Sequence, residues 1–163
     1  MTHSINRARE FHSAFGHPIA PAATPGDRKL RELRVKLIAE ELTELCQALG
    51  VDLTLEVAHS RAKYRTDEKQ AAVRFEVNAV LEDDEVNLVE AADALGDLDY
   101  VVQGANLVFG FPAEPVLTEI HRANMSKLGA DGLPVYREDG KVMKGPNYTP
   151  PDVAAVLAAH DIG

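Results

Sequence analysis

The sequence predicts an all-α fold, a bundle of four to five helices formed as a single domain over residues 1–163. Two long stretches repeat apolar residues every three to four positions, which is the period of a helix with one buried face. Glycine and proline gather between these stretches, where the chain is expected to turn. With 163 residues, 45% of them hydrophobic, the chain is long enough to bury one core.

Capping and turn residues divide the chain into helical segments. We expect Ser4 and Asp27 to cap the first two helices, because short oxygen-bearing side chains accept hydrogen bonds from first-turn amides. Gly50 and Gly110 follow the second and third helices, where glycine commonly ends a helix. Pro151 suits the first turn of the last helix. The segments expected to be helical are residues 4–15, 27–49, 85–109, 113–127 and 151–160.

Residues 51–87, between the two long helices, resemble an insertion. Residues 51–57 alternate between apolar and polar as a strand does, whereas residues 68–81 repeat apolar side chains at helical spacing. A short alternating run does not separate strand from helix, so both alternatives stay open for 51–57. Further along, residues 129–150 are rich in glycine and proline and predict a loop long enough to serve a function.

Composition limits the class of protein and its partners. The chain has 17 Lys and Arg against 26 Asp and Glu, which argues against duplex nucleic acid as the main partner. Small phosphorylated ligands stay compatible with this charge if divalent metal ions lie between the negative groups. Apolar runs fall far short of the ~20 residues of a membrane span, and the N-terminus lacks a signal-peptide pattern. The single cysteine, Cys46, favours a packing role in a cytoplasmic protein without membrane contact.

The segment 27–49 places carboxylates on its apolar face. At ~100° per residue, Glu41 projects from the middle of the apolar stripe, Glu44 lies inside its edge and Glu40 lies at the polar boundary. An ionised carboxylate that faces a core is costly unless it is paired or bound to metal. The apolar stripe consists of Leu30, Leu33, Leu37, Ile38, Leu45, Ala48 and Leu49.

The segment 85–109 repeats this feature. Glu90, Asp93 and Asp97 follow a spacing of i, i+3 and i+7, so they line one face. Asp99 points away from that face and is expected to be solvated. The acidic face continues into the apolar residues Tyr100, Val101, Gly104 and Val108. A separate apolar stripe, expected to pack elsewhere, holds Leu88, Ala91, Leu95, Leu98, Val102 and Phe109.

Two antiparallel helices would bring the two acidic faces opposite each other. Oxygen ligands of this kind suit a hard cation such as Mg²⁺, with Mn²⁺ as an alternative. The competing interpretation is that the acids pair with Arg or Lys, or lie at an open helix end. Because two independent helices carry a patterned set, we favour metal binding.

Basic residues nearer the C-terminus suggest contacts to phosphate. Asn124 and Lys127 share a face of the segment 113–127 with His121, and Lys141 and Lys144 lie in the glycine- and proline-rich loop. A flexible lysine there can neutralise a phosphate tail. The alternative is that all of them are ordinary solvated surface residues. The sequence has no Ser/His/Asp triad pattern, zinc-ligand spacing or glycine-rich phosphate loop.

The motifs resemble those of a known superfamily. Glu41-Leu-Thr-Glu44, preceded by Glu40, resembles the ExxE element of the all-α nucleotide pyrophosphohydrolases. This superfamily includes MazG proteins, dimeric dUTPases and phosphoribosyl-ATP pyrophosphohydrolase. The stretches His121–Lys127 and Asp139–Tyr148 resemble a MazG-like and phosphoribosyl-ATP-pyrophosphohydrolase-like subgroup. The resemblance covers most of the chain except about 50–87 and implies a MazG-like, oligomeric helical bundle.

The second acidic motif of that superfamily, ExxD, fits this chain in two registers. If Asp97 is the motif aspartate, the expected glutamate is Ala94, and Asp93 replaces it from the same face. Alternatively, Glu90-Ala-Ala-Asp93 is the literal ExxD, one helical turn earlier. Both registers stay open.

The resemblance implies Mg²⁺-dependent hydrolysis of a nucleoside triphosphate to the monophosphate and pyrophosphate, in a house-cleaning or nucleotide-pool role. Glu40 would orient or deprotonate the attacking water, and Asn124 would contact the nucleotide. The metal ligands would be Glu41, Glu44, Asp93, Asp97 and Glu90. Phosphates would be held by Lys127, Lys144 and Lys141, with base stacking on Tyr148 or Phe11.

Two alternatives to this activity remain. One is hydrolysis of phosphoribosyl-ATP, and the other is a catalytically silent helical protein that binds nucleotide, metal or a partner. We also expect a homodimer or a homotetramer, because helices with two broad apolar faces usually bury one of them against a partner.

Overall fold

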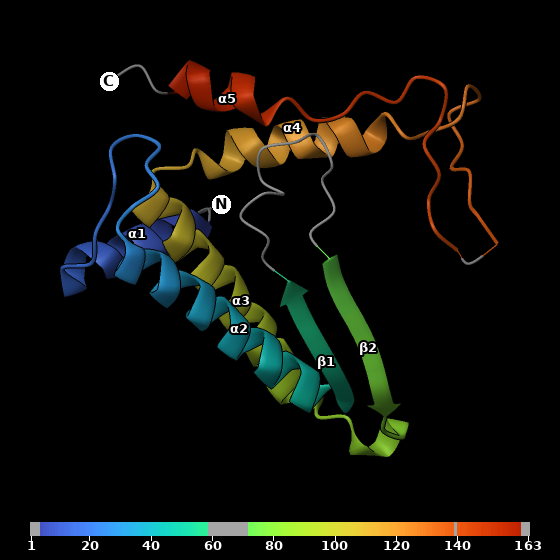
Figure 1. The fold of residues 1–163 in the computed structure, drawn as a ribbon, viewed down its shortest axis with the longest axis horizontal. Coiled ribbons are helices and arrows are strands. Elements are labelled where there is room, and N and C mark those ends of the chain that lie inside the picture. Colours follow the sequence, from blue (N-terminus) through green and yellow to red (C-terminus); the bar gives the residue numbers. More distant parts are fainter. Residues whose placement is uncertain (1–3, 59–71, 139, 161–163) are drawn as a thin grey trace. The chain divides into compact units, whose positions relative to one another are not determined.

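The computed structural model describes residues 4–58, 72–138 and 140–160 (Figure 1). The chain forms helices α1 (Ser4–Phe15), α2 (Arg28–Ala48), α3 (Leu88–Phe109), α4 (Ala113–Met125) and α5 (Val153–His160). A short 3-10 helix, η2 (Asp83–Glu85), precedes α3. Strands β1 (Val51–Ala58) and β2 (Ala72–Val80) pair as an antiparallel two-stranded sheet. The predicted all-α class is therefore confirmed, with one β-hairpin added to it.

Side-chain caps set where the long helices begin. Asp27 caps α2 as predicted, because its Oδ1 accepts a hydrogen bond from the Leu30 amide at 2.8 Å. The third helix begins at Leu88 rather than residue 85. Its start is fixed by Asn87, whose Oδ1 accepts hydrogen bonds from the amides of Val89 at 3.1 Å and Glu90 at 3.2 Å.

The bounds predicted for α1 are confirmed, whereas α4 ends at Met125 rather than residue 127 and α5 begins at Val153 rather than residue 151. Ser4 lies inside the first turn of α1 and does not precede it. Pro151 lies before α5, whose cap is Asp152. The Asp152 Oδ1 accepts a hydrogen bond from the Ala155 amide at 3.0 Å. An aspartate cap thus replaces the proline as the feature that starts the last helix.

The predicted helix over residues 68–81 is wrong for residues 72–80, which form β2; residues 68–71 lie outside the described residues. The strand reading of 51–57 is confirmed, since these residues form most of β1. The two strands pair with Leu55 opposite Phe75 and Thr54 opposite Glu76. Backbone pairing with a neighbouring strand therefore outweighs the helical spacing of the apolar residues in 72–80.

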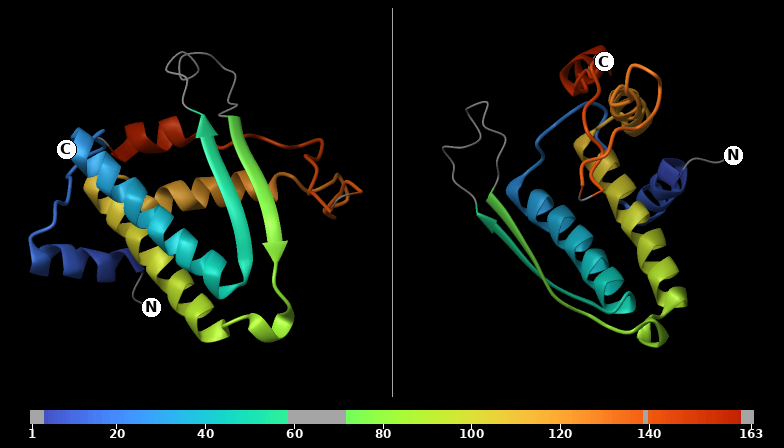
Figure 2. Two further views of the ribbon diagram at one scale, coloured as in Figure 1. Left: turned by 60° about the horizontal axis from the view of Figure 1, so that its bottom comes forward. Right: turned by 90° about the vertical axis from the view of Figure 1, so that its right-hand side faces the viewer.

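The chain divides into two compact units. We call residues 1–31 with 102–163 the terminal unit, and residues 32–101 the middle unit. In the terminal unit, α4 and α5 lie side by side (Figures 1 and 2). The loop after α1 is tied to the end of α3, because the Ala20 amide donates to the Leu107 carbonyl at 2.9 Å. Gly110, with φ of +66°, ends α3 so close to Ala22 that a Cβ there would lie 2.0 Å from its carbonyl oxygen.

In the middle unit, the facing parts of α2 and α3 run side by side in opposite directions, and the β-hairpin lies along α2 (Figure 2). The buried hydrophobic residues of this unit are small, namely Ala48, Ala91 and Ala94. The predicted stripe on α2 is only partly buried, since Leu33 and Leu49 are exposed. On α3, the second stripe is only partly covered within the unit, because Leu88 is 74% and Leu95 54% exposed.

Membrane-spanning character is not found in the described helices. None of them combines the length and the hydropathy needed to cross a lipid bilayer.

Candidate active site

The acidic face of the middle unit lies between α2 and α3. Glu41 is half-buried on α2, and Glu44, Asp93 and Asp97 are exposed beside it. The pKa of Glu41 is raised from its ordinary value, first by burial and then by repulsion from Glu44, Asp97, Glu40 and Asp93, in that order. Burial alone raises the pKa of a carboxyl, and the further repulsion on Glu41 comes from carboxylates that lie near it. The fold therefore brings acids of both helices together, as the two patterned stripes predict.

The other two predicted acids lie at the margin of this group. Glu90 is exposed near the start of α3 and contributes nothing to the pKa shift of Glu41. Glu40 is exposed, and its Oε1 lies 3.4 Å from the Lys36 ammonium, an i, i+4 ion pair on α2. Such an exposed pair contributes little to stability. Glu40 and Glu44 both line a shallow groove of about 370 Å³ that follows α2.

The acidic residues Glu41, Glu44, Asp93 and Asp97 suit a hard divalent cation, because their side chains are all carboxylates. In the described ranges, no three His, Cys, Asp or Glu side chains converge closely enough to hold an ion. After burial, repulsion from the neighbouring acids is what raises the pKa of Glu41. A Mg²⁺ ion would offset that repulsion. The residues that could hold it are Glu41, Glu44, Asp93 and Asp97.

The predicted phosphate-binding residues lie in the terminal unit. Lys127 follows α4, and its ammonium donates a hydrogen bond to the Asn124 Oδ1 at 2.8 Å. The Lys144 ammonium lies 4.5 Å from the centre of the Tyr148 ring, a cation–π contact. The Gly145 amide donates to the Lys127 carbonyl at 2.9 Å, so the segment after Lys144 runs beside the end of α4.

Lys141 lies on a separate turn of the same loop. It is exposed, and its carbonyl accepts a hydrogen bond from the Arg137 amide at 2.9 Å. An isolated bridge between Tyr136 and Val142 closes the turn. Residues 129–138 and 140–150 form a loop held by these backbone contacts, and its functional role stays a prediction.

Arg34 is a buried charged residue of α2 that the sequence reasoning missed. It is only 5% exposed, its Nε has no hydrogen-bond partner, and burial lowers its pKa. Seven residues before Glu41, it lies on the same face of α2, about 10 Å away along the axis. A spacing of i, i+7 to the central glutamate is the signal that could have found it.

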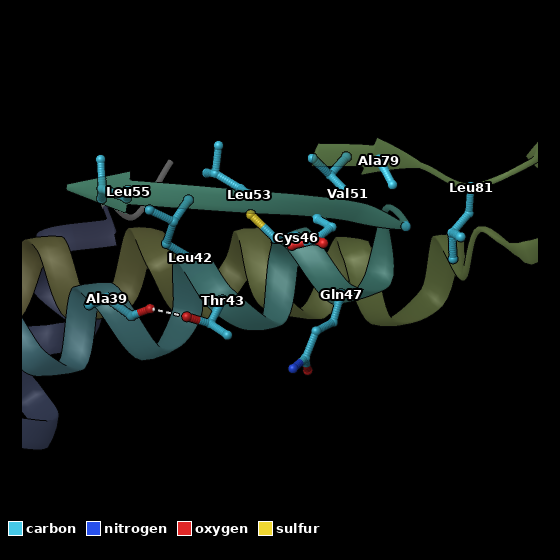
Figure 3. Close-up of a pocket in the computed structure, with 12 residues that line it drawn as sticks. Ala39, Leu42, Thr43, Cys46, Gln47, Val51, Leu53, Leu55, Ala79 and Leu81 are labelled. Carbon is cyan, nitrogen blue, oxygen red and sulfur yellow. Dashed lines mark hydrogen bonds between the residues drawn. The ribbon is translucent and has the colours of Figure 1, made fainter. Parts of the chain in front are cut away.

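A cavity on another side of α2 was also not predicted. It has a volume of about 550 Å³ and separates α2 from the β-hairpin (Figure 3). Its walls are mainly aliphatic, including Leu42, Leu53 and Leu55, and the Thr43 hydroxyl on its rim donates to the Ala39 carbonyl at 2.7 Å. Cys46, expected to be a packing residue, is half-buried and lines this cavity.

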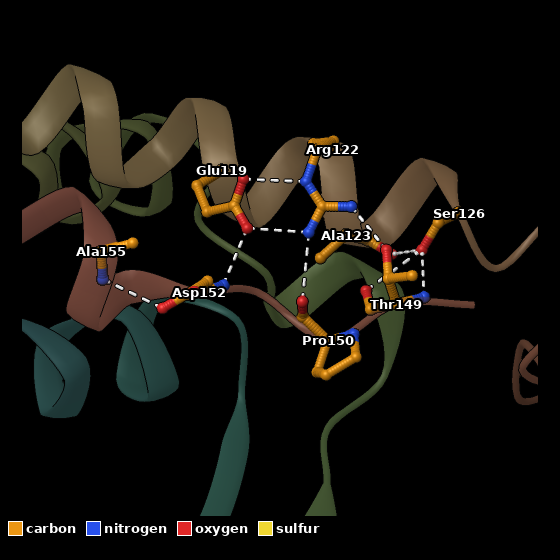
Figure 4. Close-up of polar contacts among 8 residues, drawn as sticks. All are labelled: Glu119, Arg122, Ala123, Ser126, Thr149, Pro150, Asp152 and Ala155. Carbon is orange, nitrogen blue, oxygen red and sulfur yellow. Dashed lines mark hydrogen bonds and ion pairs between the residues drawn. The ribbon is translucent and has the colours of Figure 1, made fainter. Parts of the chain in front are cut away.

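A polar network on α4 is the third feature that sequence reasoning missed. Arg122 and Glu119 form a two-pronged ion pair, with nitrogen–oxygen distances of 2.8 and 2.7 Å, and further hydrogen bonds reach the segment before α5 (Figure 4). Opposite charges at i and i+3 on a helix signal such a pair in the sequence. The segment to which it binds, 30 residues further along in the loop region, gave no signal.

Comparison with known proteins identifies the family. The model of the PRA-PH family, phosphoribosyl-ATP pyrophosphohydrolase, matches residues 8–124. The match includes both acid-bearing helices and ends at Asn124, so Lys127, Lys141, Lys144 and Tyr148 lie beyond it. No curated protein matches the chain. The resemblance to the all-α pyrophosphohydrolase superfamily, inferred from the acidic motifs, is confirmed.

Proposed function

We propose a substrate for this chain, which belongs to the phosphoribosyl-ATP pyrophosphohydrolase family and is a pyrophosphohydrolase. The proposed reaction is the hydrolysis of phosphoribosyl-ATP to phosphoribosyl-AMP and pyrophosphate. The family match over residues 8–124 carries the proposal, because it runs through both acid-bearing helices. Hydrolysis of ordinary nucleoside triphosphates breaks the same kind of bond, and the family's description favours phosphoribosyl-ATP over that broader activity.

The carboxylates of the middle unit are proposed to hold Mg²⁺. When bound, Mg²⁺ would screen the charge of the triphosphate and lower the pKa of a coordinated water. Glu41 is proposed as the central ligand, with Glu44 on the same helix and Asp97 and Asp93 on α3 as its neighbours. Support comes from the pKa of Glu41, which is raised first by burial and then by the charges of Glu44, Asp97, Glu40 and Asp93.

Glu40 is proposed to orient the attacking water and to take its proton. A glutamate at the polar margin of the acidic face has a free route to solvent, unlike the half-buried Glu41. As the water oxygen bonds to phosphorus, the bridging phosphorus–oxygen bond breaks, and the proton passes to the Glu40 carboxylate.

The loop of the terminal unit is proposed to bind the anionic substrate. Lys127 and Lys144 would neutralise phosphate oxygens, with Lys141 as a further point charge. Asn124, already hydrogen-bonded to Lys127, would keep that ammonium oriented and contact the nucleotide. Tyr148 would stack its ring against the base. The same ring contacts the Lys144 ammonium, which would place the base close to a phosphate-binding lysine.

We also propose that the chain acts as a homodimer or homotetramer. The exposed leucines of α3, Leu88 and Leu95, support this assembly because large apolar side chains on a helix face usually pack against a partner.

A pyrophosphate-release assay tests the proposed function. The purified protein, supplied with Mg²⁺, is offered phosphoribosyl-ATP, the four dNTPs and the four NTPs at equal concentrations. We expect phosphoribosyl-ATP to give the highest kcat/KM, and chelation of the metal to abolish release. Higher kcat/KM with a nucleoside triphosphate would instead assign the broader activity. The absence of release from every nucleotide would refute the proposal.

A further inference from the structure

The segment 145–152 is fastened along α4 by hydrogen bonds. We call this segment the strap. Each of its anchors on α4 comes from one face, since Glu119, Arg122 and Ser126 follow a spacing of i, i+3 and i+7 (Figure 4). At the other end, the Gly145 amide donates to the Lys127 carbonyl at 2.9 Å. The strap thus runs antiparallel to α4 and begins directly after Lys144.

Arg122 is the centre of this fastening. Its Nη1 donates to the Thr149 hydroxyl at 2.6 Å, and its Nη2 donates both to the Pro150 carbonyl at 3.1 Å and to Glu119. Glu119 in turn accepts the Asp152 amide at 2.7 Å. The guanidinium therefore donates its hydrogen bonds to other groups of the protein. This arrangement makes Arg122 a structural anchor rather than a group that contacts phosphate.

Two further contacts fix the register of the strap. The Thr149 amide donates to the Ser126 Oγ at 3.0 Å. Gly145 lies so close to the end of α4 that a Cβ would come within 2.0 Å of the Leu128 carbonyl oxygen. Only glycine lets the chain pass at that distance. The contacts at both ends of the strap fix the same register, so a shift of the strap by one residue would break all of these contacts.

We propose that Arg122 and Glu119 are positioning residues for substrate phosphate, acting through the strap on Lys144 and Tyr148. This inference rests on the substrate role proposed above for Lys127 and Lys144. A phosphate held between two lysines needs both ammonium groups in place before it binds, since ordering a loose loop at binding costs affinity. The strap supplies that order by holding residue 145 against residue 127. The strap also gives a role to Arg122 and Ser126 of the motif His121–Lys127, because the proposed chemistry does not use these two residues.

The test compares wild type with Arg122→Lys, Lys144→Ala and the double variant. Arg122→Lys keeps the positive charge but loses the planar fork, so it cannot reach Glu119, Thr149 and Pro150 together. We expect KM for phosphoribosyl-ATP to rise about tenfold, the equivalent of one charge-assisted contact, while kcat stays within about twofold. The double variant should have the KM of Lys144→Ala alone, because both changes remove the same interaction. Amide exchange in the peptide containing Gly145 should become faster in Arg122→Lys.

Thr149→Val supplies a second variant if Arg122→Lys folds poorly. It removes the hydroxyl that Arg122 binds and keeps the shape of the side chain, and Thr118→Val on exposed α4 surface is its matched control. Thr149→Val should raise KM, and Thr118→Val should not. Unchanged KM in Arg122→Lys and Thr149→Val, or additive effects in the double variant, would overturn the positioning role alone. A wild-type protein inactive on every nucleotide would refute the proposed function, and this inference with it.

Discussion

Glu41 of α2 and Asp97 of α3 repel each other across the helix pair, and this repulsion is one of the causes that raise the pKa of Glu41. Two helices distant in sequence thus share one electrostatic site. Burial and the charges of Glu44, Glu40 and Asp93 act in the same direction. A protein that keeps such a cluster bears a stability cost without a cation.

Replacement of Glu41 should separate stability from activity. Glu41→Gln removes one of the repelling charges and keeps the size of the side chain, so the melting temperature of the metal-free protein should rise. Mg²⁺-dependent pyrophosphate release should fall by at least about a hundredfold, as expected for loss of a metal ligand. Glu10→Gln, an exposed change on α1, is the control for both measurements. Full turnover by Glu41→Gln would exclude Glu41 as a ligand.

Mg²⁺ should stabilise the wild-type protein. A ligand that binds only the folded state at 100 times its Kd adds about 2.7 kcal/mol to the free energy of unfolding. Thermal unfolding should therefore shift upward with millimolar Mg²⁺ and return after chelation. The shift should shrink in Glu41→Gln, because that variant has one carboxylate fewer. Identical melting curves with and without the ion would contradict a metal site.

Helix positions and the shared acidic face were predictable from the sequence, and the second strand of the hairpin was not. Glu41 and Asp97 stand out because charges recur at core spacing on long segments, where the helical period is unambiguous. Residues 72–80 mislead because their helical spacing is short, and pairing with β1 decides their structure. The strap depends on contacts between residues about 30 positions apart, as between Arg122 and Thr149, and no local pattern encodes them. The spacing of Arg34 to Glu41 is visible in the sequence, but its burial is not.

The ion pair on α4 should lose its contribution to stability in acid. Hydrogen bonds from the Arg122 side chain, and then from the Asp152 amide, lower the pKa of Glu119 from 4.5 to about 2. The stabilisation is present above pH 4.5, the value for the unfolded chain, and is lost as the pH falls toward 2. The stability difference between wild type and Glu119→Gln should therefore be constant near neutral pH and vanish near pH 2. Glu114→Gln on the same helix is the control, and a difference that persists at pH 2 would contradict this assignment.

The exposed face of α3 should mediate self-association. Leu95, 54% exposed, lies one helical turn after the buried Ala91, and Leu88 at the start of the helix is 74% exposed. A stable interface needs roughly 800 Å² from each partner, and a helix face with several leucines can supply the apolar part of it. Light scattering should therefore give a dimer or tetramer for wild type and a smaller species for Leu95→Glu. Leu133→Glu, in the loop, should leave the mass unchanged, and a monomeric wild type would refute the proposed assembly.

The two registers of the second acidic motif predict opposite effects on activity for substitutions of Glu90 and Asp97. Glu90 and Asp97 are seven residues apart, about 10 Å along α3, so one Mg²⁺ with ligands at ~2.1 Å cannot bind both directly. Asp97 acts on the pKa of Glu41, whereas Glu90 does not, which favours the register that contains Asp97. Asp97→Asn should therefore lower kcat/KM at saturating Mg²⁺ by about a hundredfold or more, and Glu90→Gln by less than about tenfold. Asp93 belongs to both registers and cannot separate them. An inactive Glu90→Gln together with a nearly normal Asp97→Asn would reverse the assignment and place the ion one turn earlier on the helix.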